Sequence, residues 1–202
     1  MEVTQTIETA LTQGSESPFA PNWGKVFMWV FILSDGLIFA SLLAAYGFLR
    51  FTSPSWPNRW EIFHPHYIAA MTILLLSSST TMAISVESLK AGKHGMARFF
   101  YLVTFLAGVT FLGMQAYEWS HFIGEGASLT GNPWGIPMFS ALFFLITGFH
   151  GFHVLSGVTI LFLVGMLKLY DKATVHTVEM AGLYWSFVDL VWVFIFTFVY
   201  LI

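Results

Sequence analysis

The amino-acid sequence predicts an all-α fold, a polytopic membrane helix bundle with five transmembrane helices. Of its 202 residues, 56% are hydrophobic and only 9% are charged, and the mean hydropathy is +0.73. Soluble domains carry about 25% charged residues, so most of this chain lacks the polar surface that water requires. The apolar residues also form five long runs, each near the ~20 residues that a helix needs to cross a bilayer.

These apolar runs define the predicted organisation of the chain. Backbone groups in lipid must be hydrogen-bonded within a helix or a closed barrel, and the runs are too long and too uniform for the alternating strands of a barrel. The predicted helices cover residues 26–49, 67–88, 99–119, 138–167 and 180–202. Residues 1–22 are polar and are expected to form a short N-terminal tail, followed by a single five-helix transmembrane domain over residues 23–202.

The basic residues predict the orientation of the bundle, because Lys and Arg are enriched in short cytoplasmic loops. Arg50 and Arg59 fall on one side of the predicted helices. The other six basic residues fall on the side of the N-terminus, namely Lys25, Lys90, Lys93, Arg98, Lys168 and Lys172. We therefore expect a cytoplasmic N-terminus and a C-terminus outside.

The composition also excludes several classes of protein. The chain has no cysteine, which excludes disulfides, thiolate-held iron–sulfur clusters and Cys-rich zinc sites. Its eight Lys and Arg residues provide no basic patch, so no nucleic-acid partner is expected.

The candidate functional residues are the ionisable groups inside the predicted helices: Asp35, Glu118, His150, His153 and Asp189. Such groups are costly in a membrane and often belong to functional sites. Each also has a structural interpretation, because a buried polar group that bonds to a neighbouring helix stabilises the packing.

His150 and His153 are three residues apart and are expected to share one helix face. They could bind a metal or a haem edge. The favoured alternative is a hydrogen-bonding pair beside a surface of small residues, Gly148, Gly151 and Gly157, where helices approach closely.

Glu118 and His121 have the Glu-x-x-His spacing of di-iron helix bundles. That site requires two such motifs and two further glutamates, and this chain has one motif. A bis-histidine haem site would require histidines on facing helices, and the chain has only seven scattered histidines. We therefore expect no metal, cofactor-binding or catalytic residue in this chain.

Four segments carry recognisable motifs in the predicted helices: FILSDGLIFASLLAAY (31–46), FLGMQAYEWSHFI (111–123), TGFHGFHVLSGVTILFLVG (147–165) and GLYWSFVDLVWVFIFTFVYLI (182–202). Together they resemble subunit III of the haem-copper oxidases. The resemblance runs in order from about residue 23 to the C-terminus, as in the five-helix bacterial type of this family. Two positions depart from the family pattern. Asp35 stands where Glu is more common, a form similar to the quinol-oxidase branch, and Ser186 replaces a usual His.

The resemblance implies a non-catalytic subunit of a terminal respiratory oxidase that reduces oxygen to water and translocates protons. Haem and copper are then expected in partner subunits. The chain is expected to pack on and stabilise subunit I, with subunit II in the same complex, and to bind phospholipids in a cleft between helices. Its expected location is the inner (plasma) membrane of a bacterium. The intramembrane acids and histidines are then structural, lipid-contacting or part of a proton environment near subunit I.

Two other functions remain open. The related small subunit of nitric oxide reductases resembles the same family and shares its five-helix plan, so the partner subunit distinguishes the two. A stand-alone proton channel or transporter is suggested by the buried acids. Transporters, however, commonly contain repeated halves, and five helices do not divide into two halves. Flux into liposomes that contain only this chain would support the transporter.

Overall fold

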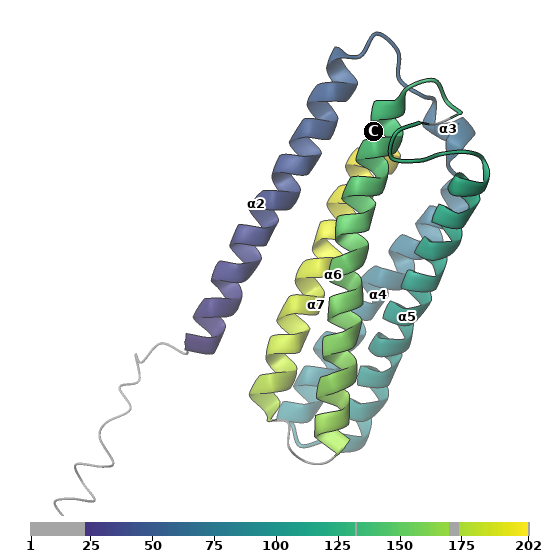
Figure 1. The fold of residues 1–202 in the computed structure, drawn as a ribbon. Helices are drawn as coiled ribbons and strands as arrows, with labels where there is room; N and C mark the ends of the chain where they lie inside the picture. The colour runs from purple at the N-terminus through teal and green to yellow at the C-terminus, as the bar shows by residue number, and fades with distance from the viewer. Residues whose placement is uncertain (1–22, 132, 170–173, 202) are drawn as a thin grey trace, which may run out of the picture.

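The computed structural model describes residues 23–131, 133–169 and 174–201, and it is built from long helices (Figure 1). They are α2 (Trp23–Thr52), α4 (Pro65–Lys90), α5 (His94–Gly124), α6 (Pro137–Leu169) and α7 (Val175–Ile195), which continues as the π-helix η1 (Phe196–Leu201). Five spans are long and apolar enough to cross a membrane, and the described ranges contain no strand. The predicted all-α, five-helix fold is therefore confirmed. The tail predicted for residues 1–22 lies outside the described residues.

The connections follow local backbone chemistry. Between α2 and α4 the proline-rich segment contains a short helix, α3 (Arg59–Ile62), which the hydropathy pattern did not predict. Pro65 begins α4, a position where its missing N–H group is not needed. Gly92 ends the turn after α4 with a φ of 72°, and the Lys93 amide donates to the Ser88 carbonyl at 2.8 Å. This glycine closure satisfies a free carbonyl of α4 and returns the chain directly into α5.

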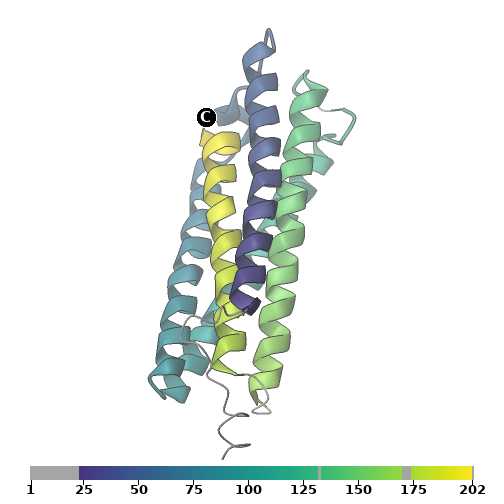
Figure 2. The same ribbon diagram turned by 90° about the vertical axis from the view of Figure 1, so that its left-hand side faces the viewer.

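The helices divide into a compact bundle and one peripheral helix. Helices α4, α5, α6 and α7 pack side by side, whereas α2 contacts α6, α7 and η1 and lies over the line where α6 and α7 meet (Figure 2). Only 17% of the most apolar stretch of α2 is buried, against 28–50% for the other spans. Helix α2 therefore presents most of its surface to lipid or to another protein.

Basic residues of the described segments lie at both ends of the bundle. Lys25 on α2 and Lys90 on α4 both contact Glu179 on α7, with N–O distances of 3.2 and 3.4 Å. These contacts bring the start of α2, the end of α4 and the start of α7 together. Arg50 and Arg59 line a pocket at the opposite end. The separation of the basic residues matches the topology, and the cytoplasmic location of the N-terminus stays a prediction.

Candidate functional site

All five ionisable residues singled out from the sequence are buried in the helix bundle: Asp35, Glu118, His150, His153 and Asp189. They do not form one site. The structure brings Asp35 and His153 together and places the other three in separate surroundings.

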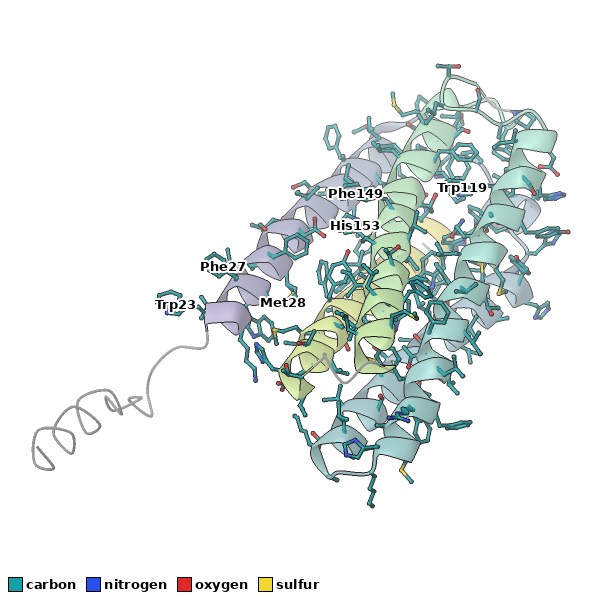
Figure 3. The ribbon with its side chains drawn as sticks, turned by 60° about the horizontal axis from the view of Figure 1, so that its bottom comes forward. Trp23, Phe27, Met28, Trp119, Phe149 and His153 are labelled. Atoms are coloured by element: carbon teal, nitrogen blue, oxygen red, sulfur yellow. The ribbon has the colours of Figure 1, made fainter. Side chains whose placement is uncertain are left out.

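Asp35 on α2 faces His153 on α6, and their Oδ2 and Nε2 atoms are 3.0 Å apart. The other ring nitrogen of His153, Nδ1, lies 2.8 Å from the carbonyl oxygen of Phe149, one turn earlier on α6. That carbonyl can only accept a hydrogen bond, so Nδ1 carries a hydrogen and Nε2 is left to face the carboxyl group. Figure 3 shows Phe149 and His153 on the side of α6 that looks toward α2.

His150 lies one turn from this pair, but it is surrounded by aromatic rings. Its side chain is fully buried, and neither ring nitrogen has a hydrogen-bond partner among the described residues. The imidazole stacks on Trp192 at a centroid distance of 5.3 Å and meets the edges of Phe39 and Phe111. An unpaired polar group in such a place costs about 1–3 kcal/mol. The imidazole of His150 therefore packs as a flat ring among aromatic side chains from α2, α5 and α7.

Asp189 on α7 bonds to α4 through a serine. The Ser78 hydroxyl lies 3.1 Å from Oδ2 of Asp189 and accepts the indole N–H of Trp185 at 2.8 Å. The same hydroxyl is 2.6 Å from the Leu75 carbonyl, so its single hydrogen is shared between two acceptors. Three buried groups thus join the middle of α4 to the middle of α7.

Glu118 on α5 bonds to its own helix and to the end of α7. Its Oε2 atom accepts hydrogen bonds from Gln115 Nε2 at 2.7 Å and from the Tyr200 hydroxyl at 2.9 Å. Tyr200 belongs to η1, where the wider π-helical turn shifts the positions of the last side chains. The bond therefore fastens the end of the chain's last helix to the bundle.

Sequence reasoning missed the partners of these acids. Gln115 could have been found, because it lies three residues before Glu118 and shares its helix face. Ser78, Trp185 and Tyr200 carried no such signal, since their partners lie on other helices far along the chain.

The histidines and acids considered as possible metal ligands lie in separate surroundings. Among the residues that the structure describes, no three His, Asp or Glu side chains converge on one point. Both nitrogens of His153 already face Phe149 and Asp35, and His150 lies between aromatic rings. Glu118 and His121 also separate, because Glu118 is buried while His121 approaches the exposed Glu125 at 3.4 Å.

An apolar groove runs between α2 and α7. Its volume is about 560 Å³, and every residue that lines it is apolar. Gly36 and Gly47 leave room on α2, while Phe187 and Phe194 on α7 and Phe198 on η1 form the opposite wall. The surface fits a hydrocarbon chain and offers no polar contact.

This fold and its buried contacts define a multi-pass membrane protein whose polar groups tie its helices together. The family model described as cytochrome c oxidase subunit III matches residues 4–202. The chain therefore belongs to the cytochrome c oxidase subunit III family, and the family predicted from the sequence is confirmed.

Its relatives include subunits of two kinds of oxidase. The chain is 34% identical to the cytochrome bo(3) ubiquinol oxidase subunit 3 of Pseudomonas aeruginosa, over 86% of this chain and 82% of the relative. It is 34% identical to the quinol oxidase subunit 3 of Bacillus spizizenii, over 86% and 84%. It is 32% identical to the probable cytochrome c oxidase subunit 3 of Mycobacterium leprae, over 98% and 96%. The chain is thus subunit III of a haem-copper oxidase, part of a respiratory complex with other oxidase subunits.

Proposed function

We propose that this chain is a non-catalytic subunit that packs on subunit I, keeps it active during turnover and binds phospholipid. Subunit II belongs to the same complex, and haem and copper lie in the partner subunits. The complex as a whole reduces oxygen to water and translocates protons across the inner (plasma) membrane of a bacterium.

The pairing of the intramembrane acids within the chain itself carries the structural part of this proposal. Asp35 contacts His153 on another helix, Asp189 contacts Ser78, and Glu118 accepts two hydrogen bonds. Acids of a transport pathway commonly face a water-filled cavity. Here each acid lies between packed helices, which supports a role in holding the bundle in one shape.

The exposed face of α2 supports the packing on a partner. Trp23 and Phe27 point away from the bundle, whereas Met28 points toward it (Figure 3). The apolar groove between α2 and α7 supports the binding of a lipid acyl chain beside this face. A peripheral helix with lipid on one side and a partner on the other fits a subunit that stabilises its neighbour.

The test is a gentle-detergent purification of the tagged chain from its native membrane. The proposal expects co-elution with a large haem-bearing subunit, a reduced-minus-oxidised haem spectrum and oxygen uptake at an electrode. Nitric oxide consumption without oxygen uptake would instead assign the chain to a nitric oxide reductase. A colourless chain that elutes alone would contradict the subunit assignment.

Two variants test the role of the acids in the purified complex. Asp35→Asn and Asp189→Asn keep the size of each side chain and replace the carboxyl group with a neutral amide, so we expect near-native folding. Each should shorten the active lifetime of the oxidase during turnover or weaken its hold on subunit I. Glu87→Gln makes the same chemical change at an exposed carboxylate and serves as the matched control. A wild-type lifetime and wild-type co-purification in both variants would contradict the assigned role.

A further inference from the structure

A second cavity lies at the end of the bundle where α5 begins and α6 finishes. Its volume is about 380 Å³, and its walls come from all four helices of the compact bundle. Its apolar lining includes Leu89, Leu102, Phe105, Leu161, Phe162 and Val178. This cavity is separate from the groove beside α2, because none of its lining residues belongs to α2.

The polar groups inside the cavity are already bonded within the protein. The Ser85 hydroxyl donates to the Ala97 carbonyl at 2.8 Å, and the Tyr101 hydroxyl donates to the Leu161 carbonyl at 2.6 Å. Gly165 allows the second contact, since a Cβ there would lie 3.1 Å from the Tyr101 ring. The interior therefore offers an occupant apolar contact and no free hydrogen-bonding group.

The charged residues of the lining are basic and exposed. His94 and Arg98 lie one turn apart on α5, and both line the cavity. No carboxylate of the described residues lies within ion-pair distance of Arg98. The acids near this end, Glu87 and Glu179, contact Lys90, and Glu179 also contacts Lys25. The guanidinium group of Arg98 is therefore open to an anion at the mouth of an apolar cavity.

We propose that this cavity binds one acyl chain of an anionic phospholipid whose phosphate contacts Arg98 and His94. The apolar walls match the chain, and the two basic side chains match the charge of the headgroup. Basic pockets between transmembrane helices on the cytoplasmic side are known to hold anionic lipid headgroups, and this is the side on which the positive charges place the cavity. The site depends only on this chain, so it stands apart from the identity of the partner subunit.

The experiment measures lipid retained by the purified full chain in mild detergent, using native mass spectrometry. Phosphatidylglycerol and phosphatidylcholine with identical acyl chains are added in equal amounts. The wild-type chain should retain phosphatidylglycerol preferentially. Arg98→Gln should lower that retention about fivefold, the contribution of one basic side chain beside an anionic lipid. Lys93→Gln removes an exposed charge outside the lining, and it should change the retention by much less.

A second variant tests whether the acyl chain enters the cavity. Leu102 is half-exposed and lines the cavity, so Leu102→Trp should fill part of the space while the fold is kept. It should reduce retention of phosphatidylglycerol, and the unfolding temperature without lipid should stay near that of the wild type. Equal retention of the two lipids, equal effects of Arg98→Gln and Lys93→Gln, or unchanged retention in Leu102→Trp would overturn the proposal.

Discussion

Trp185 fills the centre of the bundle because two glycines make room for it. Its side chain is completely buried on α7. A Cβ on Gly108 of α5 would lie 2.5 Å from its Cη2 atom and 2.8 Å from a methyl group of Val158. On the other side, a Cβ on Gly157 of α6 would lie 3.0 Å from its Cε3 atom. The indole N–H is fixed as well, since it donates to Ser78 on α4. The ring has little freedom to move away from α5.

Gly108→Ala should therefore destabilise the protein. Carbon atoms pack at about 3.5–4.0 Å, so the new methyl group requires a shift of about 1 Å in the ring or the helix. Overpacking of this kind costs about 1–3 kcal/mol. An alanine gains up to about 1 kcal/mol over glycine in a helix interior, which offsets part of that cost. We expect a net loss of about 1–2 kcal/mol.

The assay is thermal unfolding of the purified chain in mild detergent. At this chain length 1 kcal/mol corresponds to about 2–4 °C, so Gly108→Ala should lower the unfolding temperature by about 2–8 °C. Gly113→Ala on the same helix is the control, since a Cβ there meets nothing within 4 Å. Combining Gly108→Ala with Trp185→Phe should cost less than the sum of the two single changes. If Gly108→Ala is as stable as Gly113→Ala, the tight contact with Trp185 is refuted.

Three further changes can be tested in the same unfolding assay. Ser186→His, which restores the residue usual in the family, should leave stability near wild type because Ser186 is exposed on α7; a large loss would show that the position is enclosed. Tyr200→Phe removes a hydrogen bond to Glu118 and should cost about 1–3 kcal/mol, and unchanged stability would show that the bond contributes little. Ser78→Ala removes the hydroxyl beside the buried Asp189 and should cost a similar ~1–3 kcal/mol, whereas a neutral outcome would mean that water replaces the hydroxyl.

The bilayer explains why the fold could be predicted from the sequence. A backbone that faces lipid must form its hydrogen bonds within its own segment, so a long apolar run that does not alternate like a barrel strand is predicted to be a helix. All five predicted runs are helical over their described residues. Each helix begins before its predicted limit, and the first four also end after it, because polar residues at the ends continue the same hydrogen-bond ladder. The change from α7 to η1 was not predictable, since the segment from Phe196 to Leu201 is as apolar as the helix before it.

The pairing of the polar residues could be predicted only within a helix. Asp35 and His153 are 118 positions apart, and their contact depends on α2 lying beside α6. Hydropathy places both helices in the membrane but does not order them around the bundle. His150 and His153 were expected to share one face, and both rings do lie against Phe39 of α2. Their other partners differ, because His150 stacks on Trp192 while His153 contacts Asp35. A spacing of three residues turns a helix by about 300°, so the two side chains lie about 60° apart on one face and can still contact different neighbours.

The glycines also show that contacts between different helices are hard to predict from the sequence. Gly148, Gly151 and Gly157 were predicted to allow close helix contact. At Gly148 a Cβ would lie 3.3 Å from Trp119, and Gly157 makes room for Trp185, so both are confirmed. The prediction is wrong at Gly151, where a Cβ would meet nothing within 4 Å. The most crowded glycine, Gly108, was not singled out, because its role depends on a tryptophan from α7.

The contact between Asp35 and His153 also explains how a peripheral helix can stay attached in a membrane. Lipid tails are as apolar as the side chains of α2, so burial alone gives this helix little reason to leave lipid for the bundle. A carboxylate moved into lipid costs about 2.5–3.5 kcal/mol on insertion scales. Separation of α2 would impose that cost on Asp35 and would leave His153 without its partner. This buried contact, together with the ion pair between Lys25 and Glu179 at the start of the helix, therefore holds α2 in place while its outer face stays exposed.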